Sequence, residues 1–155
     1  MKKAFTMIEL IFVIVIIGIL AVIALPKLNA TRTDAKVSSI IANLKHVSID
    51  SASYYTARGE SEWINAKVNH VTDVPLFKDK NCKKQTDLNT TFVGNLLYLC
   101  DDDKSVIEFN ATNTHLFINK GSSNSLIAKA VYDSKVFKAL NTSNGIRLGG
   151  VSVVK

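Results

Sequence analysis

The stretch AFTMIELIFVIVIIGILAVIALPKL, residues 4–28, is almost entirely apolar and carries one acid, Glu9, close to its start. Residues 5–25 are long enough to cross a bilayer as a helix, which needs about 20 mostly apolar residues. Many of them are β-branched and would favour a strand in water. Inside a bilayer a lone strand would leave its backbone groups unpaired, so this composition predicts a single membrane-spanning helix.

The residues that flank this segment predict its orientation and its fate. Lys2 and Lys3 precede the apolar run, and positive charge stays on the cytoplasmic side, so the remainder of the chain is expected to be exported. The run ends without a convincing small-x-small site of the kind at which secretory signal peptides are cut. We therefore expect the segment to be retained.

Glu9 is the unusual residue of the segment. An acid at the centre of a bilayer costs roughly 2.5–3.5 kcal/mol, and less near the interface. In one interpretation Glu9 simply lies in the headgroup region. In the other it pairs with a cation, and a free amine at Phe5 would lie one helical turn away on the same face. Phe5 carries such an amine only if the peptide bond after Ala4 is cut.

The N-terminal residues resemble the signature of type IV pilins and of type II secretion pseudopilins. The matching features are Lys2-Lys3, the small residue Ala4, the sequence FTMIE at 5–9, the apolar run and Pro26. The resemblance implies that a prepilin peptidase cuts between Ala4 and Phe5 and that Phe5 is then N-methylated. It also implies that Glu9 pairs with the terminal amine of an adjacent subunit. Ala4 stands where the family usually has Gly.

Two residues are weak points of the predicted membrane helix. Pro26 cannot donate to the carbonyl of Val22, so the helix should bend or loosen there. Gly18 is a second site of backbone freedom. Both residues are also routine in membrane helices. The functional hypothesis is that the segment between Gly18 and Pro26 unwinds locally when subunits pack.

The second part of the predicted helix, residues 26–58, is amphipathic. Its apolar residues recur at roughly helical spacing, and Gly59 is a common type of helix stop. A helix over 5–58 is too long for a domain of this size to cover, so its first half must contact lipid or other molecules. The apolar residues are Val37, Ile40, Ile41, Leu44, Val47, Tyr54 and Tyr55.

Residues 59–155 are predicted to form a small β-rich domain. Candidate strands are 92–100, 106–109, 116–118 and 146–154, and 110–114 is a hairpin loop. Residues 126–140 fit either a short helix or a strand. The predicted fold class is α+β, with an antiparallel sheet on the C-terminal half of the long helix, and the pilin family has the same layout. The predicted division is a leader (1–4), the helix (5–58, with its membrane part at 5–25) and the exported domain (59–155).

Cys82 and Cys100 are the two cysteines of the chain. The exported side of the membrane is oxidising, so an even count predicts a disulfide, with two reduced thiols as the alternative. The bridge would stabilise the fold by roughly 3 kcal/mol in the chain-entropy model.

The net charge of +6 is spread along the chain, and one cluster of lysines lies beside Cys82. A bridged basic loop could contact DNA phosphates, which would suit an uptake pilin. A solvated loop is the simpler interpretation, because no aromatic residues are interleaved as in single-strand platforms. The cluster consists of Lys78, Lys80, Lys83 and Lys84.

Two N-x-T sequons begin at Asn89 and at Asn110. Each has an acid two residues before the asparagine, Asp87 and Glu108, and this resembles the extended acceptor pattern of bacterial N-glycosylation systems. A chain rich in Asn and Thr also produces such matches by chance.

The remaining polar residues do not indicate catalysis. Asp101-Asp102-Asp103 is interpreted as a turn, with calcium binding as the alternative. The histidines His46, His70 and His115 lack metal or triad spacing. We therefore expect no enzymatic activity, no cofactor and no metal.

The sequence thus predicts a structural subunit of the bacterial inner membrane. The first hypothesis is a type II secretion pseudopilus, with other pilin-like subunits, the peptidase, an assembly platform and the bilayer as partners. The alternative is a surface or DNA-uptake pilus that adheres or binds nucleic acid. A third possibility is a membrane-tethered periplasmic domain that never polymerises.

Overall fold

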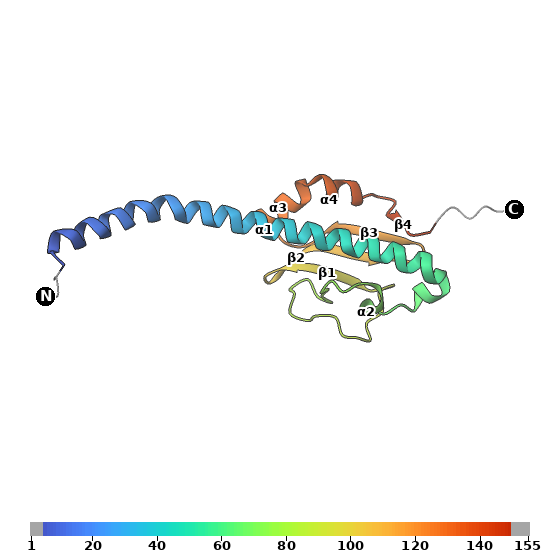
Figure 1. Ribbon diagram of the computed structural model, residues 1–155. Helices are drawn as coiled ribbons and strands as arrows, with labels where there is room; N and C mark the ends of the chain where they lie inside the picture. The colour runs from blue at the N-terminus through green and yellow to red at the C-terminus, as the bar shows by residue number, and fades with distance from the viewer. Residues whose placement is uncertain (1–4, 150–155) are drawn as a thin grey trace. The chain divides into compact units, whose positions relative to one another are not determined.

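The computed structural model describes residues 5–149, except for the side chains of residues 25, 26, 28 and 29. A long helix, α1 (Met7–Ile64), is followed by the short helix α2 (Val68–Val71). Three strands come next, β1 (Leu96–Asp101), β2 (Lys104–Ala111) and β3 (His115–Lys120). Two short helices, α3 (Leu126–Asp133) and α4 (Lys135–Leu140), precede β4 (Ile146–Arg147) (Figure 1).

The chain divides into two compact units, Met1–Lys36 and Val37–Lys155. In its described part the first unit consists of the start of α1, whose backbone is helical through Gly18 and Pro26. The second unit contains the rest of α1 and every described strand. The helical residues 37–58 therefore belong with the globular unit, whereas the sequence-based division began that domain at 59.

The core of the second unit lies between α1 and one face of the sheet. Ile40, Leu44 and Val47 of α1 are buried at helical spacing, which confirms the amphipathic stripe predicted from the sequence. Ala128, Val131 and Phe137 of α3 and α4 join the same core. The sheet contributes alternate residues of its apolar face, namely Leu97, Leu99, Ile107, Phe109, Ala111, Leu116 and Ile118.

A glycine interrupts α1 just before its end. Gly59 has φ 79° and ψ 174°, a conformation that other residues adopt only at a cost. The helix resumes after Gly59 and ends at Ile64, beyond the stop predicted at 58. The last turn carries Trp63 into the core, where its ring centroid lies 5.4 Å from that of Phe92 and its Nε1 donates to the carbonyl of Thr112 at 2.9 Å.

The sheet has the order β1-β2-β3-β4, and every neighbouring pair is antiparallel. The hairpin predicted over 110–114 is confirmed, because Ala111 pairs with Leu116. The first strand begins at Leu96 rather than at 92. Gly94, with φ 79°, breaks the extended run before it, so the apolar residues at 92 and 93 precede the strand.

The segment at 126–140, for which the sequence allowed a helix or a strand, is helical. Ser125 caps α3 by accepting from the amide of Ala128 at 3.1 Å, and Ser134 caps α4 by accepting from Phe137 at 3.2 Å. The final strand is shorter than predicted, since β4 ends at Arg147. The remainder of that prediction, 150–154, lies outside the described residues.

The loop between α2 and β1 is irregular and is held to the sheet by backbone hydrogen bonds and by a disulfide. Phe77 exchanges two backbone hydrogen bonds of 2.9 Å with Tyr98 of β1. Cys82 and Cys100 form a disulfide with a Cα–Cα distance of 6.0 Å, which confirms the predicted bridge. The bridge therefore fastens the tip of this loop to the end of β1.

Candidate functional site

The N-terminal part of α1 is a continuous apolar surface. Met7–Ala24 is long and apolar enough to cross a membrane, and none of it is buried within the chain. Its large side chains are about half or more exposed, up to 81% for Met7. A surface of this kind is unstable in water and requires lipid or the apolar faces of other helices.

Glu9 lies in the first turn of this helix and is held by Thr6. Its Oε2 accepts from the backbone amide of Thr6 at 2.8 Å and from the Thr6 hydroxyl at 2.8 Å. The amide of Glu9 donates back to the Thr6 hydroxyl at 3.4 Å. Thr6 immediately precedes the helix, so the pair forms a capping box that satisfies two free donors of the helix end.

The contact between Thr6 and Glu9 was not predicted from the sequence. The signal was present as T-x-x-E at 6–9, directly before an apolar run, which is the sequence form of a capping box. The interaction fixes one oxygen of the carboxylate next to the helix N-terminus, where the helix dipole also favours negative charge. A carboxylate can accept about four hydrogen bonds, so Glu9 retains acceptor capacity for a further donor.

The other predicted residues of the N-terminal segment have different positions. Phe5 is 82% exposed and precedes the helix. Gly18 lies within α1, and a Cβ added there would meet nothing within 4 Å. Pro26 also lies within the helical backbone of α1. Ala4, the predicted residue before the cleaved bond, lies outside the described residues.

The four lysines beside the disulfide differ in their contacts. Lys78 pairs with the carboxylate of Asp87 at 2.9 Å, so its charge is engaged. Lys80, Lys83 and Lys84 are exposed on the loop that the disulfide fastens. All four lysines are therefore exposed, and Lys78 differs in forming an ion pair with Asp87 on the surface.

The two sequons have opposite environments. Asn89 is exposed in a turn between α2 and β1. Asn110 lies inside β2, where it pairs with Leu96 of β1 on one side and with Phe117 of β3 on the other. The Thr90 hydroxyl in the first sequon donates to Asp87 at 2.6 Å. This bond and the Lys78 ammonium hold the pKa of Asp87 below its usual value.

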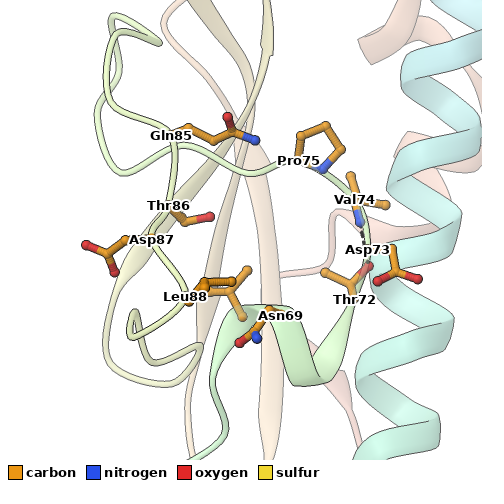
Figure 2. Close-up of a pocket in the computed structure, with 10 residues that line it drawn as sticks. Asn69, Thr72, Asp73, Val74, Pro75, Gln85, Thr86, Asp87 and Leu88 are labelled. Carbon is orange, nitrogen blue, oxygen red and sulfur yellow. Dashed lines mark hydrogen bonds between the residues drawn. The ribbon is translucent and has the colours of Figure 1, made fainter.

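A hollow of about 220 Å³ lies between α2 and the loop that contains residues 85–88 (Figure 2). Figure 2 shows the carboxylate of Asp87 turned away from this hollow. Its ten lining residues include Asp73, Asp87 and several hydroxyl and amide side chains, but no histidine, cysteine or lysine.

The acidic run and the histidines are scattered across the second unit. Asp102 and Asp103 form the turn between β1 and β2, as predicted, whereas Asp101 is the last residue of β1, and Asp102 adopts φ 52°. His46 and His70 are exposed, and His115 is half-buried with its Nδ1 2.8 Å from the Thr114 hydroxyl. Over residues 5–149 no three His, Cys, Asp or Glu residues are grouped in a way that could hold a metal ion.

The comparisons with known proteins agree with the N-terminal geometry. Residues 1–25 match the family model described as the prokaryotic N-terminal methylation motif. The chain therefore carries a type IV pilin-like prepilin signature, and the apolar helix Met7–Ala24 within it fits a membrane-anchored pilin. The helix and the four-stranded antiparallel sheet together form a pilin-like α+β fold. No curated protein and no solved structure matches the chain.

Proposed function

We propose that this chain is a structural subunit that polymerises through its N-terminal helix into a type II secretion pseudopilus. In this proposal the leader at 1–4 stays in the cytoplasm, residues 5–25 cross the inner membrane, and the globular domain is exported. The peptidase removes the leader after Ala4, and the new terminus at Phe5 is methylated. The subunit then leaves the bilayer by packing its helix against those of earlier subunits.

The observation that carries the proposal is a single acid on an otherwise apolar, unburied helix. Glu9 lies in the first turn of Met7–Ala24, and Thr6 holds it through two bonds of 2.8 Å. Thr6 is a neutral donor, so it orients the carboxylate without neutralising it. Among packed helices the remaining charge requires a cation, and the terminal amine at Phe5 of a neighbouring copy would supply one.

The same pair would set the register of the filament. An apolar helix can slide along another with little change in contact energy. A buried acid and amine meet at only one axial offset, so every other offset leaves two charges unpaired. A polar group that fixes the register of an apolar seam is well attested in coiled coils.

N-terminal mass spectrometry of the chain extracted from bacterial membranes tests the proposal. We expect the mature chain to begin at a methylated Phe5 and to retain the apolar segment. A chain that begins after Pro26 would mean that the segment is an ordinary signal peptide and would refute the proposal. A retained but uncut leader would favour the tethered domain that does not polymerise.

A DNA-uptake pilus is the second candidate, and the exposed Lys80, Lys83 and Lys84 favour it. Three lysines on a loop fastened by a disulfide could neutralise phosphates without ordering a flexible segment. Binding should then weaken steeply with salt, with a log–log slope of up to about −2.7 for three contacts on duplex DNA. Replacing the three lysines by glutamine should abolish this slope, whereas the same triple substitution at the exposed Lys129, Lys135 and Lys138 of α3 and α4 serves as the charge-matched control. Unchanged binding would remove this candidate.

A further inference from the structure

We propose that Asn89 is an acceptor for N-linked glycosylation, and that the fold excludes the second sequon at Asn110. This inference rests on the proposed function, because the acceptor must lie on the exported side of the membrane. The donor would be an oligosaccharide linked to a membrane polyprenyl diphosphate. The enzyme would be an oligosaccharyltransferase that acts on folded, exported chains.

The environment of Asn89 suits an acceptor. The residue is exposed in a turn of the irregular loop that precedes β1. Its backbone carbonyl accepts from Lys67 Nζ at 3.1 Å, and no described residue forms a hydrogen bond with its side-chain amide. Leu88, next to it, is 73% exposed, whereas Thr90 on the other side is buried and its carbonyl accepts from the amide of Val68 at 2.9 Å. A transferase that encloses this peptide would have to release the bond from Val68 to Thr90 and the isolated bridge between Lys67 and Thr91, but no bond within the four-stranded sheet.

The second sequon asparagine, Asn110, lies in an environment that does not suit an acceptor. It lies in β2, an inner strand of the sheet, and is opposite Leu96 on one side and Phe117 on the other. Its neighbours Phe109 and Ala111 are buried in the core. To bend this sequon around an active site, the enzyme would have to break ladder bonds to both adjacent strands. Both sequons match the extended acceptor pattern, so only their structural environments distinguish them.

The acid that precedes the acceptor asparagine, Asp87, is also accessible to an enzyme. Asp87 precedes Asn89 by two residues, and Figure 2 shows its carboxylate turned outward from the adjacent hollow. It is held by the Thr90 hydroxyl at 2.6 Å and by Lys78 at 2.9 Å. Exposed ion pairs are worth little, so a cationic pocket of the enzyme could replace Lys78 at small cost.

The reaction is a group transfer without oxidation or reduction. The side-chain amide nitrogen of Asn89 attacks the anomeric carbon of the first sugar. A carbon–nitrogen bond forms, the bond from that carbon to the diphosphate oxygen breaks, and the polyprenyl diphosphate leaves with the bonding electrons. The amide nitrogen loses one proton to a base of the enzyme. The Thr91 hydroxyl, two residues on, completes the sequon and accepts only one hydrogen bond, from Asn95 Nδ2 at 2.8 Å.

The test uses the full-length chain in a bacterial host, with and without a bacterial oligosaccharyltransferase and its lipid-linked oligosaccharide. The intact mass of the membrane-extracted chain reports glycosylation. Digestion by protease added to spheroplasts reports export independently. We expect one glycan increment, lost in Asn89→Gln and retained in Asn110→Gln. We expect Asp87→Asn to reduce the glycosylated fraction, since it removes the acid with little change in volume.

The outcomes separate this proposal from the one on which it rests. An exported, protease-sensitive chain without the increment would overturn the acceptor site and leave the proposed topology intact. An increment that survives Asn89→Gln or disappears in Asn110→Gln would overturn the assignment to the turn. A protease-protected chain without sugar would refute the topology, and the acceptor site with it.

Discussion

Replacing Glu9 by glutamine separates the two interactions that this side chain is expected to make. Glutamine still accepts from the Thr6 amide and hydroxyl, which now donate to Glu9 at 2.8 Å each, so the capping box is preserved. The charge is lost, and the amine of the neighbouring subunit would remain unpaired among packed helices. Removing one partner of a buried ion pair costs about 3–5 kcal/mol. At about 1.4 kcal/mol per factor of ten, subunit association should weaken between roughly a hundred-fold and a few thousand-fold.

The assay is the fraction of mature subunit in sheared, sedimentable filaments, measured beside the amount in the membrane. Membrane insertion of Glu9→Gln should not fall, because a neutral amide is cheaper to place near a bilayer than a carboxylate. Glu9→Ala is the matched variant, since it removes both the charge and the cap. If the charge governs assembly, both variants should fail equally. Normal filaments from Glu9→Gln and poor ones from Glu9→Ala would show that the cap matters instead, and would refute the register argument.

Three further predictions concern the globular unit in the full chain in detergent. Replacing both Cys82 and Cys100 by serine should lower the free energy of unfolding by about 3 kcal/mol, measured by denaturant titration. Gly59→Ala should cost about 1–3 kcal/mol in thermal melts, because its φ of 79° strains any residue with a Cβ. Asp87 has a lowered pKa in the fold, so its interaction with Thr90 stabilises above about pH 4 and is lost as pH falls through and below the ordinary value of 3.8. The free energy of unfolding, measured between pH 6 and pH 3, should therefore fall more steeply toward low pH for the original chain than for Asp87→Asn.

Each of these predictions has a contrary result. Equal stability of the oxidised chain and its double serine variant would mean that backbone hydrogen bonds hold the loop without the bridge, among them those of Phe77 with Tyr98 and of Lys80 with Ser105. A Gly59→Ala chain as stable as the original would mean that α1 can continue without its break, since space for the methyl is open. Parallel pH profiles for Asp87→Asn and the original chain would show that its contacts contribute nothing measurable.

The parts of the fold that follow from local chemistry were predictable from the sequence. Ile40, Leu44 and Val47 repeat at the helical period, and burial of that stripe followed directly. The polar run between two apolar strands fixed the hairpin at 110–114. The exported compartment and the count of two cysteines predicted the bridge between Cys82 and Cys100.

The parts that depend on tertiary contacts were not predictable in the same way. Gly59 was expected to end the helix, but burial of Trp63 against Phe92 favours one more turn beyond it. The start of β1 was placed too early, because the break at Gly94 depends on its unusual φ and on its bond to the carbonyl of Ala111. The role of Thr6 differs from these, since its pattern was visible and was overlooked.

The buried indole at the end of α1 also gives the protein a built-in optical reporter. Trp63 is the one tryptophan of the chain, it is fully buried, and its Nε1 bonds to a carbonyl beside the hairpin. Its fluorescence therefore originates where the end of α1 packs against the sheet. Separation of these two elements would expose the indole to water and change its emission. Assembly, oxidation and sugar attachment can each be followed against that signal in the unlabelled molecule.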